Sequence, residues 1–408
     1  MPDQGPPAAE EKLALSIPEL VAMVAALSAL NALSIDVMLP ALPMIGRDFT
    51  LTVDNDRQLV IVAYVALFGV SQLVYGPLAD AFGRRSVLNW ALAIFILGSL
   101  LCVVAPSFEL FLLARALQGV GAAATRVIAT AVVRDLVQGR RMAQIMSMAM
   151  TVFMIVPIVA PGVGQLLLFI APWRWIFGAL LLYAASVLIW TLLRLPETLR
   201  PEHKIPFRMG RVASAYLTVL RERQTVGYML AATLITACLF SYIASSQQIF
   251  VDVFGLGPVF PVAFASIAVA ISFGTFLNSR IVMLHGMRRI SHMMTVAFTL
   301  FAAAMAAIAA LGGVGFWVFF VMLALTFSAF GLIASNYNAL AMEPMGRVAG
   351  AASAMFGAVT ASGGALLGGL IARAFDGTIL PFTLGLAACG LGALAIVVWT
   401  ERGRFAGA

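Results

Sequence analysis

The sequence predicts an all-α integral membrane protein whose twelve transmembrane helices form two pseudo-symmetric six-helix bundles. Of its 408 residues, 62% are hydrophobic and only 11% are charged, whereas soluble globular chains carry about a quarter charged residues. The apolar residues fall into runs of about 20 between polar breaks, which is the length that a helix needs to cross the hydrocarbon core. A long polar stretch near the middle of the chain separates six of these runs from the other six.

The twelve expected spans set the domain boundaries. They cover residues 18–43, 58–80, 86–105, 109–133, 144–170, 174–194, 225–250, 259–281, 289–311, 315–341, 347–373 and 378–400. We therefore expect an N-terminal tail over 1–16, a bundle over 17–195, a linker over 196–224, a second bundle over 225–400 and a C-terminal tail over 401–408. Basic turns at Gly83-Arg84-Arg85 and Gly286-Met287-Arg288-Arg289 follow the second span of each half, as a duplication would produce.

Basic residues are distributed unevenly between the two sides of the predicted membrane. With the N-terminus in the cytoplasm, nineteen of the 25 Lys and Arg residues lie in cytoplasmic segments, four lie outside and two lie within a span. The positive-inside rule therefore places both termini in the cytoplasm. This topology explains the net charge of +7 without a nucleic-acid partner.

The chain shows no pattern typical of an enzyme, a metal site or a cofactor site. Cys102, Cys238 and Cys389 lie in separate apolar runs, where a thiol behaves as a small hydrophobe. Walker, nucleophile-elbow and His-Glu metal motifs do not occur. His285 and His292 flank the second basic turn, where we expect them to be solvated. We expect no catalytic residue, no metal and no cofactor, and a proton gradient as the energy source.

Ionisable residues within spans are costly and indicate a functional site. Asp36 is the one carboxylate well inside a span, about 9 Å from its outer end at 1.5 Å per residue, and Arg115 lies at a similar depth. Arg115, Gln118, Gly119 and Arg126 share one helical stripe, which we expect to face a water-filled cavity. Aspartate can release its proton whereas arginine stays protonated, so Asp36, Arg115 and Arg126 are the proton-coupling candidates. The alternative is a static Asp36–Arg115 bridge that fixes span packing.

Two motifs resemble those of the major facilitator superfamily. The segment that contains Arg115, Gln118 and Gly119 is similar to its motif B, whose arginine is associated with proton coupling. The turn after the second span resembles its motif A, with Gly76, Asp80, Gly83, Arg84 and Arg85 at the matching positions. The resemblance implies that Asp80 interacts with the end of a helix in the opposite half, with Arg84 and Arg85 as its charge partners, and so controls the conformational change.

The fifth span is similar to motif C, which is typical of the antiporters of this superfamily. The matching residues are Pro157, Pro161, Gly162 and Gly164. The segment departs from the motif at two positions, since Ala160 precedes Pro161 and Gln165 follows Gly164. These departures weaken the assignment as an antiporter slightly.

Further segments in both halves resemble one branch of the superfamily, the Bcr/CflA (bicyclomycin/chloramphenicol resistance) type of drug:proton antiporter. They include Asp36-Val-Met-Leu-Pro40, Val133-Arg134-Asp135, Trp173-Arg174-Trp175 and Ala349-Gly350-Ala-Ala-Ser353. The resemblance implies the major facilitator fold. It also implies a proton-coupled antiporter of the cell inner (plasma) membrane that exports small organic compounds or drugs by alternating access.

Polar and aromatic side chains within the spans are the candidates for substrate contact. An apolar cavity with a few polar groups suits amphiphilic compounds. The candidates are Tyr64, Gln72, Tyr242, Gln247, Gln248, Asn336, Tyr337 and Asn338. Hydrogen bonding between helices explains each of them equally well.

Two other functions remain open at this stage. One is a proton symporter or facilitator for uptake or export of a specific metabolite such as a sugar or an amino acid, and the other is a membrane-embedded enzyme or scaffold. The few ionisable groups within the spans argue against an enzyme. The expected partners are a small-molecule substrate, protons and the lipid bilayer, and one chain with two halves is expected to act as a monomer.

Overall fold

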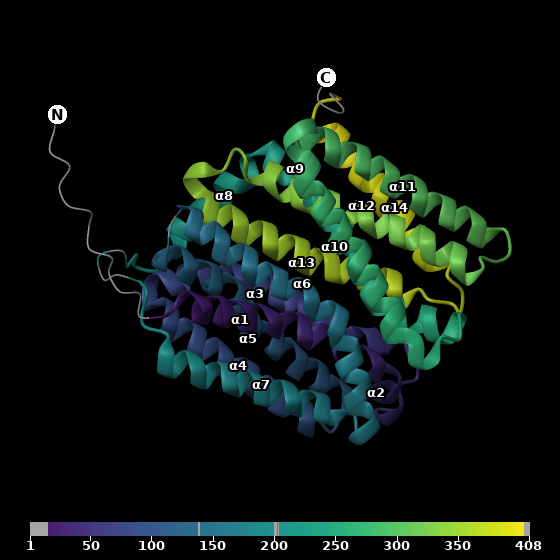
Figure 1. The fold of residues 1–408 in the computed structure, drawn as a ribbon, viewed down its shortest axis with the longest axis horizontal. Helices are drawn as coiled ribbons and strands as arrows, with labels where there is room; N and C mark the ends of the chain where they lie inside the picture. The colour runs from purple at the N-terminus through teal and green to yellow at the C-terminus, as the bar shows by residue number, and fades with distance from the viewer. Residues whose placement is uncertain (1–14, 138, 200–201, 203, 404–408) are drawn as a thin grey trace.

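The computed structural model describes residues 15–137, 139–199, 202 and 204–403, which form an all-helical protein (Figure 1). Within these residues, eleven helices are long and apolar enough to cross a membrane. In one further helix, α6 (Gly139–Ile170), the apolar stretch among the described side chains covers Ile155–Ile170. The predicted all-α membrane protein is confirmed, and twelve crossing helices remain a prediction. The expected tail segments 1–14 and 404–408 and the linker positions 200, 201 and 203 lie outside the described residues.

The long helices form two bundles, one from each half of the chain (Figure 1). The N-terminal bundle contains α6 together with α1 (Ile17–Asp36), α3 (Leu59–Phe82), α4 (Arg84–Val104), α5 (Phe108–Leu136) and α7 (Arg174–Arg194). The C-terminal bundle contains α9 (Arg223–Gln247), α10 (Phe260–His285), α11 (Met287–Ala310), α12 (Phe316–Met342), α13 (Ala349–Arg373) and α14 (Leu380–Thr400). Between them, the linker contains α8 (Met209–Arg221), a helix that the polar composition of this stretch did not predict.

The first expected span is a broken helix. Pro40 has no N–H and therefore cannot donate to the Asp36 carbonyl, so α1 ends at Asp36. The chain continues as the 3₁₀ turn η1 (Leu39–Ala41) and the short helix α2 (Leu42–Asp48). The span expected over 18–43 therefore contains a helix end, whose last carbonyl groups need partners from outside the helix.

The two expected basic turns share one backbone conformation. Gly83 has φ 101° and ψ 147°, and Gly286 has φ 77° and ψ 152°. Glycine adopts a positive φ without steric cost, so both turns reverse the chain tightly between two long helices. This agreement supports the internal repeat that the sequence suggested.

The two bundles contact each other along α3 with α13 and along α6 with α10. Figure 1 shows α13 lying beside α3. The helices approach closely at Gly69, where a Cβ atom would strike the backbone of Ser362. The Ser362 hydroxyl donates a hydrogen bond of 2.7 Å to the Ala66 carbonyl. Small residues therefore bring the halves into backbone contact, as is usual between membrane helices.

The long axis of the bundles has two different ends. The linker end carries α8, the start of α1 and the ends of α7 and α14, and an ion pair of 2.8 Å joins Arg194 to Glu19 there. The far end carries α2, η2 (Asp54–Gln58) and the π-helical turn η4 (Gln248–Val253). Figure 1 shows α8 and α2 at these opposite ends.

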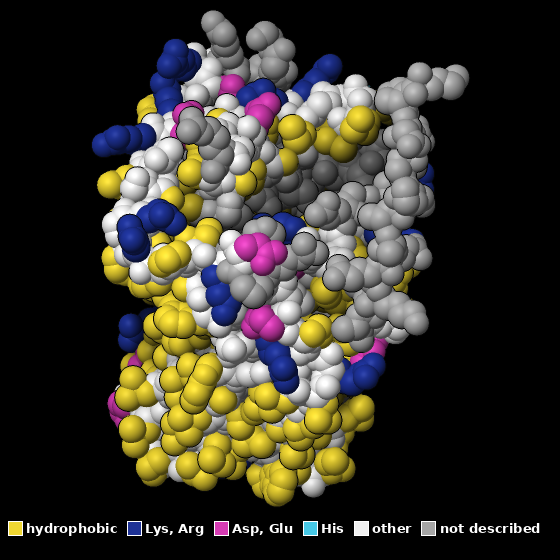
Figure 2. Space-filling view, turned by 90° about the vertical axis from the view of Figure 1, so that its left-hand side faces the viewer, with side chains coloured by type: hydrophobic (Ala, Val, Ile, Leu, Met, Phe, Trp, Pro, Cys, Tyr) yellow, Lys and Arg dark blue, Asp and Glu magenta, His cyan; other side chains and the backbone are white. Residues whose placement is uncertain are grey.

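The lateral surface is apolar. Large hydrophobic side chains of α4 and α7 are exposed, among them Trp90 at 74% and Leu193 at 76%. Figure 2 shows hydrophobic side chains covering the lower part of the viewed face, with most Lys and Arg side chains above them. Such a surface requires a lipid environment.

Candidate functional site

A cavity of about 510 Å³ lies between the two bundles at the linker end. Its walls are α3, α5, α12 and α13, and the linker and α8 contribute a further side. The predicted site residues that line it are Gln72, Gly76, Asp80, Arg84, Arg126 and Asn338. The volume lies in the range of small-molecule sites.

Motif A forms a network with the N-terminal bundle and the start of the linker. Arg84 pairs with Asp80 at 2.5 Å and with Asp135 at 3.1 Å, and its backbone N–H donates to Glu197 at 2.7 Å. Arg85 donates to the Leu192 carbonyl at 2.6 Å. The Asp80 carboxylate thus has its partner in its own half, and the helix of the opposite half that the resemblance implied does not provide an ion pair in the part of the chain that is described.

At the far end, polar side chains of the two halves bind each other. We call this set the far-end latch. Arg57 pairs with Asp252 at 3.2 Å, and Arg373 pairs with Asp56 at 2.8 Å. Asn55 donates to the carbonyls of Arg373 and Phe375, and Gln248 binds both Asn55 and Gln58. The two halves are therefore joined at the far end, and the cavity described above lies at the linker end.

Arg115 is fully buried and is bound by backbone carbonyls. Its guanidinium donates to the Ser34 carbonyl at 3.1 Å, the Val60 carbonyl at 3.2 Å and the Gln118 side chain at 2.6 Å, and it lies 4.5 Å from the centre of the Tyr64 ring. Ser34 is among the last residues of α1, whose carbonyls lack helical partners. The expectation that Arg115 faces a water-filled cavity is therefore wrong, whereas Arg126 on the same stripe does line the cavity.

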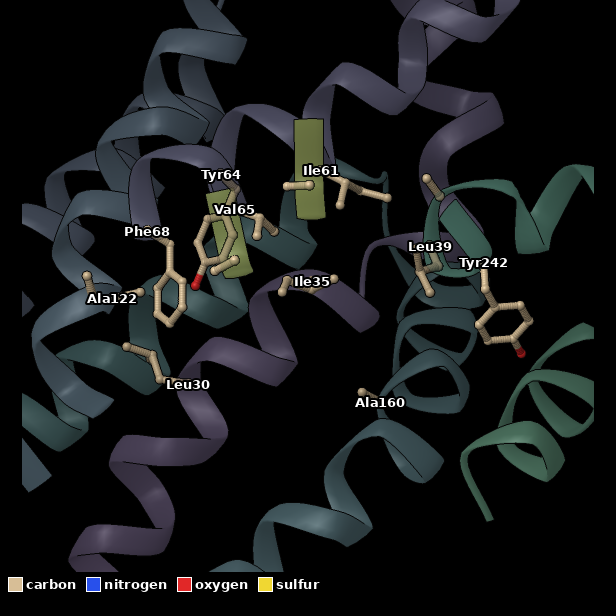
Figure 3. Close-up of a cluster of buried hydrophobic side chains, with 14 of the residues drawn as sticks. Leu30, Ile35, Leu39, Ile61, Tyr64, Val65, Phe68, Ala122, Ala160 and Tyr242 are labelled. Atoms are coloured by element: carbon tan, nitrogen blue, oxygen red, sulfur yellow. The ribbon is translucent and has the colours of Figure 1, made fainter. Parts of the chain in front are cut away.

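Asp36 lies at the end of α1, 5% exposed, and is the only carboxylate in the buried set of the described residues. No ion pair joins it to Arg115 within the described chain, so the static bridge is not present. Its carboxylate is close enough to Tyr242 of α9 for the two to interact electrostatically. Figure 3 shows Tyr242 beside Leu39 of η1, with Ile35 on the α1 side. Asp36 therefore lies where the first half meets the second.

Motif C brings α6 against the break in α1. A Cβ atom at Gly164 would overlap the Val37 carbonyl oxygen, next to Asp36, whereas nothing lies within 4 Å of such an atom at Gly162. Pro157 and Pro161 lie inside α6. The glycine at 164 is thus required by a close approach of two backbones, which supports the end of α1.

Motif B packs α5 between its neighbours. A Cβ atom at Gly119 would strike the backbone of α3 at Tyr64, and Gln118 donates to the Ser99 hydroxyl of α4 at 2.7 Å. Figure 3 shows Tyr64 and Phe68 of α3 close to Leu30 of α1 and Ala122 of α5. Motif B therefore packs α5 against α3 and α4, and its Arg115 links α5 to α1.

The eight candidates for substrate contact divide into two groups. Gln72 and Asn338 line the cavity. The other six lie outside the cavity lining, and most bind neighbouring helices: Tyr64 donates to Asn31, Tyr242 to the Phe264 carbonyl, Gln248 to Asn55 and Asn336 to Asn278, while Tyr337 pairs with Thr295, and Gln247 is buried. Hydrogen bonding between helices thus accounts for most of this set in the present conformation.

His292 is buried rather than solvated. It lies within 2.9 Å of the Tyr228 hydroxyl, which donates to Glu401 at 2.6 Å. Arg288 of the second basic turn donates to Glu401 at 3.2 Å. The expectation for His292 was wrong because Glu401, at the end of α14, contacts Tyr228 and Arg288 beside it. The sequence alone does not show that contact.

Comparison with known proteins decides the family. A family model described as Major Facilitator Superfamily matches residues 24–368. The chain belongs to the Major Facilitator Superfamily. The predicted resemblance to this superfamily is thereby confirmed, and the assignment of the three motifs remains a prediction.

Three relatives of this major facilitator come from bacteria. An "Uncharacterized MFS-type transporter YdgK" of Bacillus subtilis (strain 168) is 32% identical over 357 residues, or 86% of each chain. A "Bicyclomycin resistance protein homolog" of Haemophilus influenzae is 28% identical over 366 residues, 89% of this chain and 91% of the relative. "Multidrug resistance protein MdtL" of Escherichia coli O9:H4 (strain HS) is 30% identical over 230 residues, 56% of this chain and 58% of the relative.

Two solved structures share the major facilitator fold. The human organic anion transporter MFSD10 (TETRAN) has a TM-score of 0.64 and 19% identity, covering 94% of this chain and 100% of that chain. The xylose transporter XylE from E. coli, in a partially occluded inward open conformation, has a TM-score of 0.70 and 12% identity, covering 95% and 98%. At these identities the likeness shows the fold alone.

Sequence reasoning missed two parts of this major facilitator. The far-end latch comes from short polar segments that carry no motif. On α8, the apolar residues Met209, Val212, Tyr216 and Val219 recur at helical spacing, which is the signal that could have revealed the helix. Tyr216 donates to the Leu73 carbonyl of α3 at 2.6 Å and lines the cavity.

Gly164→Ala tests the contact between α6 and the end of α1. We expect it to lower the free energy of unfolding by about 1–3 kcal/mol because the new methyl group overlaps the Val37 carbonyl. Gly162→Ala, two residues earlier in α6, is the matched control and is expected to raise stability by up to about 1 kcal/mol. Thermal unfolding of the purified variants in detergent measures both changes. Equal effects of the two substitutions would contradict the close approach.

Arg57→Ala combined with Arg373→Ala tests the far-end latch. We expect the loss of two ion pairs between the halves to shift the protein toward conformations that are open at the far end. The measurement is the distance between spin labels placed at Val53 and Asp376, which belong to different halves.

Arg174→Ala is the control for the latch variant. It removes an ion pair with Asp48 that lies at the same end within one half. We expect longer label distances for the latch variant and unchanged ones for the control. Identical distributions for both variants would contradict the assignment of the latch.

Proposed function

We propose that this protein is a proton-coupled antiporter that exports small organic compounds, including drugs, by alternating access. The observation that carries the proposal is Asp36. It is the one carboxylate in the buried set of the described residues, and it lies at the end of α1 between α6 and α9. A group that gains and loses a proton there can link proton binding to the relative position of the two halves.

The partners of Arg115 support the proposal, because Asp36 is not among them. Its guanidinium binds the Ser34 and Val60 carbonyls and Gln118. Arginine stays protonated and holds the end of α1 in place, while aspartate can change its charge. Asp36 is therefore the residue to which we assign proton uptake and release, and Arg115 is a positioning residue.

The asymmetry between the two ends supports alternating access. The far-end latch joins the halves, and the cavity lies between them at the linker end. In the opposite state, the far-end latch opens and the linker end closes. Asp80 then leaves Arg84 and interacts with a helix of the second half. Proton entry at the far end and substrate entry at the linker end then favour opposite states, as antiport requires.

The names of relatives support export of drugs. One relative is a bicyclomycin resistance protein homolog and another is a multidrug resistance protein. Because basic residues concentrate in the segments of the linker end, we assign that end to the cytoplasm. The protein then resides in the inner membrane of a bacterial cell, and its two halves enclose the pathway in a monomer.

Asp36→Asn tests the proposal in everted membrane vesicles. A panel of dyes, antibiotics and amino acids is presented to vesicles that carry an imposed pH gradient, while the internal pH is followed. We expect the wild-type protein to accumulate at least one compound with release of protons. The asparagine side chain of the variant carries no titratable proton. We therefore expect accumulation of the compound against its own concentration gradient to fall to background.

Asp376→Asn serves as the control for this experiment. Asp376 is an exposed carboxylate that binds Thr378 within its own loop. We expect this variant to transport as the wild type does. Undiminished coupled transport by the Asp36→Asn variant would remove Asp36 from the mechanism, and proton movement in the same direction as substrate would indicate a symporter.

A further inference from the structure

The charges around the cavity are unbalanced. Its lining contains five arginines, Arg84, Arg126, Arg134, Arg208 and Arg211, and one acid, Asp80. Arg84 is neutralised by Asp80 and Asp135. None of the other four arginines forms an ion pair with a carboxylate of the described residues. A concave site lined with one sign of charge focuses its field on ligands of the opposite sign.

Arg126 lies deep in this cavity. It precedes the end of α5 at Leu136 by ten residues, which is about 15 Å along the helix axis. Its side chain is exposed and lines the cavity, and its guanidinium has neither a hydrogen bond nor an ion pair with any described residue. Positive-inside anchoring places arginines near helix ends, so it does not account for an arginine at this depth.

The two arginines of α5 differ in their partners. Arg115 is fully buried and donates to three acceptors. Arg126 is exposed in the cavity, and its donors are unused by the described chain. A planar guanidinium matches a carboxylate with two parallel hydrogen bonds. Arg126 therefore has the chemistry of an anion-binding group, whereas Arg115 has a structural role.

A second donor lies at the wall of the same cavity. Gln72 of α3 is 3% exposed and lines the cavity, and its side-chain Nε2 is buried without a hydrogen-bond partner in the described chain. Buried polar groups of native proteins nearly always have partners. Gly357 of α13 leaves the space that the Gln72 amide occupies, because a Cβ atom there would strike it. The unpaired amide hydrogens indicate a ligand that supplies acceptors.

We propose that the cavity binds amphiphilic organic anions, with Arg126 holding the carboxylate or a similar acidic group and Gln72 donating a further hydrogen bond. The apolar part of the ligand would contact Val127, Ala131, Ala215, Ala354 and Phe356, which also line the cavity. The inference rests on the proposed function, since it names the substrate class of that exporter. The four cavity arginines that have no carboxylate partner among the described residues would repel lipophilic cations.

Ligand-induced thermal stabilisation of the purified full-length protein tests this inference. The probes are indole-3-acetate, salicylate and nalidixate, each compared with its neutral amide. For at least one acid we expect half-maximal stabilisation at a concentration about tenfold or more below that of its amide, as for a charged hydrogen bond. Arg126→Gln is expected to abolish this difference, and Arg126→Lys to keep part of it.

Two further variants separate a binding defect from a folding defect. Gln72→Leu leaves every charge in place and is expected to weaken binding of the acid several-fold. Arg280→Gln removes the same charge from the exposed surface of α10, outside the cavity lining, and is expected to bind as the wild type does. Equal binding of acids and amides, unchanged selectivity in Arg126→Gln, or no stabilisation by any acid of the panel would each overturn the inference.

Failure of this inference is distinguishable from failure of the proposed function. Stabilisation is measured at equilibrium without a pH gradient. If binding is selective for acids through Arg126 but transport does not depend on the pH gradient, the proposed proton coupling is wrong and the anion site is supported. If transport is coupled to protons but acids and amides bind equally, the anion site is wrong and the proposed exporter function is supported.

Discussion

The first half of the molecule depends on the way Arg115 meets the broken end of α1. Pro40 ends the helix at Asp36 and leaves carbonyl groups without helical donors, and the guanidinium supplies a donor to one of them while also binding α3. A cation at a helix C-terminus is also favoured by the helix dipole. One buried side chain thus links α1, α3 and α5, and it fixes Asp36 at the junction with the second half.

Arg115 and Arg126 illustrate how one helix serves two purposes. They share a stripe of α5 in sequence, but they lie eleven residues apart, and the surroundings of the helix change over that length. Near the far end α5 is enclosed by α1, α3 and α4, whereas near the linker end it lines the cavity. An arginine in the first setting donates to three acceptors of the protein, and an arginine in the second is available to a ligand.

The sequence predicted the long apolar helices, the two halves and the family, because apolar runs and compact motifs are local features. It did not predict the partners of Arg115. These depend on the end of α1 at Asp36 and on the orientation in which α1 packs against α5. It also could not separate Gln72 and Asn338, which line the cavity, from Asn336 and Tyr337, which bind Asn278 and Thr295. A polar residue in a span reveals its role only when its neighbouring helix is known.

The position of the far-end latch has a consequence for the conditions in which the protein works. Its two ion pairs lie at the surface, with Asp252 and Arg373 about half exposed, and dissolved ions screen such pairs over about 8 Å at physiological ionic strength. Arg115, buried among carbonyls, is shielded from those ions. In the proposed orientation, where the far end faces the medium outside the cell, we therefore expect salinity to shift the balance between the two proposed access states without altering the architecture of either half.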